Sequence, residues 1–147
     1  MGFDCNQIRD CIRDIGLGLG FDAQTEKPIG EGVKVDVVWR IQIPRLGVTK
    51  YVFIIHFKGP IDSLIMDLQK TKSDPGVQKI IVVSDRKQLE LLGKVVPAEL
   101  KGSISLWDIE DVKRTHEHLA EALKGIKKLG LPLVDILVLS RFPLRSS

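Results

Sequence analysis

The sequence has few cysteines and no long apolar run, and each absence excludes a class of protein. Of its 147 residues, only Cys5 and Cys11 are cysteines, and their spacing fits neither a CxxC metal motif nor a framework of paired cysteines. A disulfide scaffold and a structural zinc site are therefore not expected, and both thiols should be reduced. No stretch approaches the length of a membrane span, and no signal-like segment follows Met1. We expect a cytoplasmic protein that contacts no membrane.

Aromatic residues and an excess of one charge are also scarce. Five Phe, two Trp and one Tyr give little support for a platform on which single-stranded nucleic acid would stack. The 22 basic and 19 acidic residues leave a net charge of +3, which permits a polyanionic partner without requiring one. A phosphate loop, a dinucleotide-binding fingerprint and a Gly-x-Ser-x-Gly turn are missing. The common nucleotide-binding and serine-hydrolase motifs therefore give no lead to function.

Strand and helix patterns alternate along the chain. Strand patterns cover residues 21–27, 34–40, 51–59, 79–84 and 103–107. Helix patterns begin near Asp4, Pro60, Asp85 and Asp108. This alternation predicts an α/β fold in a single domain over residues 1–147, with a central mixed sheet and helices on both faces. The second and third strands should be antiparallel neighbours, and the last three strands should run parallel.

The second and third strands bring polar side chains together. Because side chains alternate between the faces of a strand, His56 and Lys58 share one face. A three-residue hairpin loop over residues 45–47 would set Asp36 opposite His56. A slip of one residue would put these two side chains on opposite faces. The predicted cluster therefore combines a carboxylate, an imidazole and an ammonium group.

The core signature of the PD-(D/E)XK nuclease superfamily is an acid on one strand, acid-x-Lys on the next strand, and a following helix that often carries a glutamine. This chain resembles that superfamily. Asp36 matches the first acid, Lys58 the lysine and Gln69 the helix glutamine. The resemblance covers roughly residues 4–107 and implies a restriction-endonuclease-like fold with α/β/α layers. In this superfamily an acid on the first helix can support the metal site, and Asp10 is the candidate here.

The sequence departs from the signature at His56, which stands where the second acid is expected. An active member needs carboxylates to hold a hard cation, and Mg²⁺ prefers oxygen ligands. We therefore expect Asp36, His56, Lys58 and Gln69 to form a degenerate, inactive site without a cofactor. If activity survived, Asp36 and Asp10 would hold Mg²⁺, or Mn²⁺, which tolerates imidazole better. The substitution His56→Glu is then expected to restore metal affinity.

Two functions fit these observations. The first is a regulatory module on a nuclease-like fold that binds DNA or a protein of transcription or DNA processing. Weak, salt-sensitive binding of nucleic acid is predicted from the basic residues around the hairpin, which are Lys34, Arg40, Arg45, Lys50 and Lys58. The second is a metal-dependent DNA endonuclease or Holliday-junction resolvase with an altered ligand set. The replaced acid favours the first function, and the retained Asp36 and Lys58 keep the second open.

Structural roles are an alternative for each candidate. Asp36 fits an ordinary polar position on a sheet, and His56 fits a half-buried imidazole in an apolar strand. The outward, solvated face of the first helix would carry Arg9, Asp10, Arg13 and Asp14. His116 and His118 lie two residues apart on the last helix and form no zinc-binding pair, with His116 turned inward. The apolar stretch over residues 131–139 fits either an edge strand or a segment that faces a partner.

Overall fold

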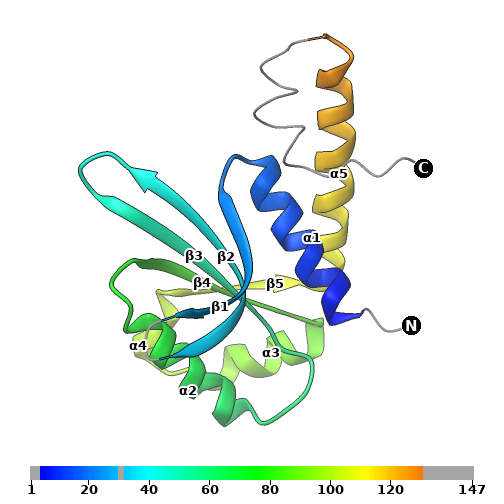
Figure 1. Cartoon of the computed structure of the whole chain (residues 1–147). Coiled ribbons are helices and arrows are strands. Elements are labelled where there is room, and N and C mark those ends of the chain that lie inside the picture. The colour runs from blue at the N-terminus through cyan, green and yellow to red at the C-terminus, as the bar shows by residue number, and fades with distance from the viewer. Residues whose placement is uncertain (1–3, 30–31, 131–147) are drawn as a thin grey trace.

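A five-stranded sheet in the order β1-β2-β3-β4-β5 forms the centre of the protein in the computed structural model, which describes residues 4–29 and 32–130 (Figure 1). The strands are β1 (Asp22–Ile29), β2 (Val33–Ile43), β3 (Gly47–Ile55), β4 (Val77–Ser84) and β5 (Ile104–Asp108). The helices are α1 (Cys5–Gly18), α2 (Ile61–Lys72), α3 (Arg86–Val95), α4 (Ala98–Lys101) and α5 (Ile109–Lys127).

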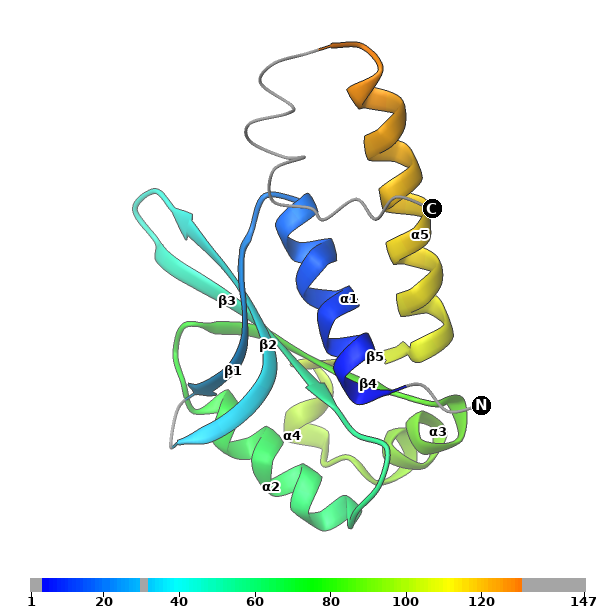
Figure 2. The same cartoon turned by 45° about the vertical axis from the view of Figure 1, so that its right-hand side comes forward.

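The sheet is mixed, as predicted. The pairs β1-β2 and β2-β3 are antiparallel, whereas β3-β4 and β4-β5 are parallel. In Figure 2, α1 and α5 lie on one side of the sheet, and α2, α3 and α4 lie on the other. The α/β class and the mixed sheet with helices on both faces are therefore confirmed. None of the described helices is long and apolar enough to cross a membrane.

Three aspartates fix the starts of helices, as the sequence patterns predicted. Asp4 accepts a hydrogen bond of 3.0 Å from a backbone N–H in the first turn of α1. Asp85 and Asp108 do the same for α3 and α5, at 2.9 and 2.8 Å. Each carboxylate satisfies a donor that the helix itself leaves free. These local contacts set the starts of α1, α3 and α5.

Two apolar cores cover the two faces of the sheet. The first core joins the sheet to α2, α3 and α4, and contains Val52 and Ile54 of β3. The second core joins the sheet to α1 and α5, and contains Phe53, with Ile55 packed against it. The alternation of side chains that was predicted for this strand is therefore confirmed as far as Ile55, where β3 ends.

The hairpin loop between β2 and β3 lies one residue earlier than predicted. It consists of residues 44–46 and not 45–47, because Ile43 pairs with Gly47. Arg45 has a left-handed φ of 71°, and Gly47 has one of 88°. A residue other than glycine thus adopts one of the two left-handed conformations of this hairpin, and left-handed backbone is uncommon for such residues. No feature of Arg45 in the sequence predicts this conformation.

Because the loop lies one residue earlier, each residue of β2 pairs with a residue of β3 two positions earlier than predicted. Extended by one residue past its last pair, the observed register sets Asp36 beside Ile54 and not beside His56. Because β3 ends at Ile55, His56 and Lys58 follow the strand instead of continuing it. The predicted facing pair of Asp36 and His56 is therefore wrong.

Strand β1 has an irregularity next to Asp36. Glu26 has a φ of 53°, and the pairing of β1 with β2 skips Glu26 and Asp36. In consequence Val35 and Val38 both pack in the first core, while Val37 packs in the second. The regular alternation of side chains between the two faces of β2 breaks at Asp36, which places its carboxylate at a local irregularity of the sheet.

Candidate functional site

Asp36 is the centre of the candidate site, and its carboxylate is bound by the backbone of the neighbouring strand. Its Oδ2 accepts a hydrogen bond of 2.7 Å from the N–H of Ile55, the last residue of β3. Burial raises the pKa of Asp36 and Glu26 adds to this effect, while the bond from Ile55 and the charge of Arg9 act in the opposite direction. One oxygen of this acid is thus already used inside the protein.

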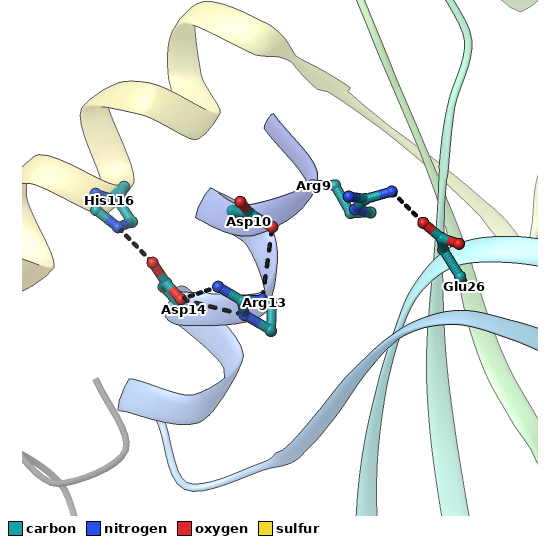
Figure 3. A network of polar contacts seen from close by, with 6 residues as sticks. All are labelled: Arg9, Asp10, Arg13, Asp14, Glu26 and His116. Carbon is teal, nitrogen blue, oxygen red and sulfur yellow. Dashed lines mark hydrogen bonds and ion pairs between the residues drawn. The ribbon is translucent and has the colours of Figure 1, made fainter. Parts of the chain in front are cut away.

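Arg9 of α1 and Glu26 of β1 form an ion pair in the neighbourhood of Asp36. The Nη1 atom of Arg9 reaches Oε2 of Glu26, and Figure 3 shows the guanidinium pointing toward Glu26 and away from the other acids of α1. Lys34 lies 3.5 Å from the other oxygen of Glu26. Both Arg9 and Glu26 act electrostatically on Asp36. A guanidinium of the protein therefore supplies positive charge beside these two carboxylates.

His56 follows β3 and is fixed to β4 through its backbone. Its N–H donates a hydrogen bond of 2.9 Å to the carbonyl of Val83, and its own carbonyl accepts one from the hydroxyl of Ser84. The ring atom Nε2 is buried and has no hydrogen-bond partner among the described residues. Burial lowers the pKa of His56, so the imidazole is neutral at pH 7. The imidazole is half-buried, as in the structural alternative for His56, but it follows the strand and its buried Nε2 is not satisfied by a hydrogen bond from the described residues.

The remaining predicted site residues make no hydrogen bond or ion pair with Asp36 in the described part of the chain. Lys58 is exposed on the bend between β3 and α2. Gln69 is exposed and lies about 12 Å along the axis of α2 from the start of that helix. Asp10 is paired with Arg13, at 3.5 Å. Residues 4–29 and 32–130 contain no cluster of three or more His, Cys, Asp or Glu side chains that could hold a metal ion.

The register also changes which residues of β3 lie beside Asp36. The residues of β3 that lie beside the backbone of Asp36 are Ile54, its partner in the extended register, and Ile55, which donates a hydrogen bond to it. Ile54 is only 9% exposed and points into the first core, away from Arg9 of α1, which acts on Asp36. Neither of these residues supplies a carboxylate to Asp36. The donor set does not fit a hard cation, which needs several oxygen ligands.

A second polar network links α1 to α5, as Figure 3 shows. Asp14 is 0% exposed, with Oδ1 at 3.2 Å from Nη2 of Arg13 and Oδ2 at 3.3 Å from Nε2 of His116. The prediction that Asp14 belongs to a solvated face is wrong, because α5 covers that side of α1. His116 turns inward, as predicted, while His118 is exposed.

Five of the eight aromatic residues surround one apolar hollow of about 440 Å³ on the face of the sheet that carries the second core. They are Phe21, Trp39, Tyr51, Phe53 and Trp107. The rings of Phe21 and Trp39 stack, with centroids 5.2 Å apart and planes at 20°. The low aromatic content of the chain gave no sign of this surface, because composition records the number of rings and not their concentration in one place.

No family model matches the sequence, and neither the curated proteins nor the solved structures contain a match. Conclusions about function therefore depend on the residues and contacts of this chain.

Proposed function

We propose that the protein is a non-catalytic nucleic-acid-binding module with a regulatory role, built on a restriction-endonuclease-like scaffold of the PD-(D/E)XK type. The order of strands and helices and the position of Asp36 on β2 support the scaffold. The observation that best supports a non-catalytic role is the hydrogen bond from the N–H of Ile55 to the carboxylate of Asp36. This acid acts as a structural acceptor between two strands.

The neighbours of Asp36 support the same conclusion. The residues of β3 next to the backbone of Asp36 are Ile54 and Ile55, and neither is an acid. Glu26 is the other carboxylate nearby, and a cation would have to compete with Arg9 for it. A carboxylate whose pKa is raised by burial is also a weaker ligand for a metal ion than an exposed, fully ionised one.

Exposed cations at the same edge of the sheet support binding of a polyanion. The start of β2 lies beside the end of β3, and β4 ends at that edge as well. Lys34, Lys58 and Arg86 stand at these strand ends, and the side chains of Lys34 and Arg86 are 66% and 82% exposed. Phosphate contacts made by such residues release counterions from nucleic acid.

The set of basic residues that was predicted to bind nucleic acid does not act as one cluster. Arg45 lies at the tip of the hairpin, at the opposite end of β2 from Lys34. Lys50 is only 24% exposed and is paired with Asp74 at 2.9 Å, whereas Lys34 and Arg86 make longer contacts of 3.5 Å with Glu26 and Asp108 and remain largely exposed. We therefore assign nucleic-acid contact to the edge that carries Lys34, Lys58 and Arg86, and name this group the edge cations.

Fluorescence anisotropy with labelled duplex and single-stranded DNA tests this function. We expect affinity to fall steeply with salt, and Lys58→Gln and Arg86→Gln each to lower the slope of log affinity against log salt by about one. Lys127→Gln removes the same charge from the exposed end of α5 and should leave the slope unchanged. Equal effects of all three variants would contradict binding at this edge. Absence of binding at low salt would contradict nucleic-acid binding and leave a protein as the expected partner.

One observation favours the second function, a metal-dependent endonuclease with an altered ligand set. Glu26 raises the pKa of Asp36, which shows that the two carboxylates lie close enough to interact. If the pair between Arg9 and Glu26 opened, two acids would become available at one edge of the sheet. Cleavage assays separate this function from the non-catalytic one, because only the endonuclease would cut DNA.

A further inference from the structure

A hollow of about 210 Å³ lies on the first-core face of β1, β2 and β3, and none of its lining residues belongs to the cluster around Asp36. It is lined by Gln24, Lys27, Ile29, Val38, Arg40 and Lys50. Each of the three strands contributes a cation, so the hollow is built on the sheet itself. Sites for drug-sized ligands occupy roughly 300–1,000 Å³, so this hollow suits a smaller group.

Two polar atoms in the lining are buried without a partner. In the described part of the chain, four buried side-chain nitrogen or oxygen atoms have no hydrogen-bond partner, and two of these are Oε1 of Gln24 and Nε of Arg40. Both residues line this hollow. Buried polar atoms are nearly always hydrogen-bonded in native proteins, to the protein or to a bound molecule, so an orphaned donor and an orphaned acceptor in one place mark where water or a ligand would bind. A ligand that uses both atoms must accept a hydrogen bond from Arg40 and donate one to Gln24.

The charges of the lining favour an anion. Arg40 and Lys50 are direct partners across β2 and β3, and Asp74 balances only Lys50. Lys27 and Arg40 form no ion pair with any described residue. Ile29 and Val38, which are 6% and 1% exposed, give the hollow an apolar floor. Charge interactions above an apolar surface are screened less than interactions in open water.

We propose that this hollow binds the phosphate group of a phosphate monoester that also carries a hydroxyl, as a sugar phosphate does. The guanidinium of Arg40 offers a planar set of donors that matches phosphate oxygens, and Lys27 and Lys50 add point charges. The hydroxyl beside the phosphate donates to Oε1 of Gln24. This site is independent of the edge cations and of the function proposed for them.

Isothermal titration calorimetry at constant ionic strength tests the site, with ribose 5-phosphate, inorganic phosphate and ribose as probes. We expect saturable binding of both phosphates and no binding of ribose. Arg40→Gln and Lys27→Gln should each weaken binding of the phosphates roughly tenfold or more. Gln24→Leu should weaken binding of ribose 5-phosphate and spare inorganic phosphate. Arg45→Gln, at the tip of the hairpin, is the matched control and should bind as the unaltered protein does.

Two results would overturn the proposal. One is the absence of saturable phosphate binding by the unaltered protein, and the other is equal binding by Lys27→Gln and Arg45→Gln. Lys27 is exposed, so Lys27→Gln should fold normally and keeps the test decisive if Arg40→Gln unfolds. Thermal unfolding of each variant checks this point.

A final arm of the experiment separates the two sources of such a group, which are a free sugar phosphate and the terminal phosphate of a nucleic-acid strand. Oligonucleotides with and without a 5′-phosphate are compared on the unaltered protein and on Arg40→Gln. A preference for the phosphorylated strand that Arg40→Gln abolishes assigns the site to strand ends. Binding of ribose 5-phosphate without that preference assigns it to a free ligand. Both results support a phosphate site, and neither depends on Lys58 or Arg86.

Discussion

The carboxylate of Asp36 and the backbone N–H of Ile55 are joined by a hydrogen bond of 2.7 Å. This bond ties β2 to β3 just beyond their last paired residues, where the pairing of β1 with β2 is also interrupted. An acid in such a position stabilises the end of the sheet. We infer that Asp36 has this structural role in a protein that does not cleave nucleic acid.

The raised pKa of Asp36 predicts a pH dependence of stability. Because burial raises this pKa, the protonated acid is favoured in the folded state. The resulting stabilisation is fully present below the pKa of the unfolded chain and is lost as the pH rises through the raised value in the folded protein. We therefore expect the unaltered protein to lose stability relative to Asp36→Asn as the pH rises from about 3 to 7. Urea unfolding of both proteins across this range measures the difference, and a constant difference would contradict the prediction.

The contact between Gly16 and Trp39 predicts an unusual cost for an alanine in a helix. A Cβ on Gly16 would lie 2.3 Å from Nε1 of Trp39, whose N–H donates a hydrogen bond of 3.0 Å to the carbonyl of Ile12. Gly16→Ala should displace the indole and lower the free energy of unfolding by about 1–3 kcal/mol.

Gly125→Ala is the matched control, because a Cβ on Gly125 would meet no heavy atom within 4 Å. That substitution, inside α5, should stabilise the protein by about 0.5–1 kcal/mol. Chemical denaturation of both variants measures whether each substitution lowers or raises the free energy of unfolding. Equal stabilisation by both substitutions would show that the indole of Trp39 does not press against α1.

The two histidines of α5 should differ in their contribution to stability. His116 lies 3.3 Å from the fully buried carboxylate of Asp14, whereas His118 is exposed. His116→Ala removes one partner of a buried charge and should cost about 1–3 kcal/mol. His118→Ala should change the free energy of unfolding by less than about 0.5 kcal/mol. Similar effects in a denaturation experiment at pH 7 would argue against the link between α1 and α5.

The observed register predicts that His56→Glu brings no second carboxylate to Asp36, because β3 ends at Ile55 and position 56 does not face Asp36. His56→Glu should therefore gain little affinity for Mn²⁺, which corrects the expectation drawn from the predicted register. Electron paramagnetic resonance of Mn²⁺ measures the binding, and circular dichroism checks that the variant folds. Tight binding by His56→Glu that is lost when Asp36→Ala is added would contradict the register.

The sequence predicted the parts of the fold that depend on local signals. Asp4, Asp85 and Asp108 precede apolar periodicity and cap their helices as expected. The register of the hairpin was missed because it depends on a left-handed backbone at Arg45, and the side chain gives no sign of it. An error of one residue in the loop was enough to misplace His56 relative to Asp36.

The candidate site was harder to predict because its contacts join distant parts of the chain. Arg9 and Glu26 are 17 residues apart and lie on different elements, so neither spacing nor periodicity connects them. Asp14 and His116 are 102 residues apart, and helical periodicity alone placed Asp14 in solvent. The choice between a solvated face and a buried network depends on how α5 packs on α1, which is a tertiary contact.

Cleavage of supercoiled and branched DNA in the presence of Mg²⁺ or Mn²⁺ tests most directly whether the protein is non-catalytic. We predict no cleavage by the unaltered protein with either ion, and no difference between it and Asp36→Ala. Robust metal-dependent cleavage that Asp36→Ala abolishes would contradict this prediction, because it would show that Asp36 and another acid, such as Glu26, complete a working metal site.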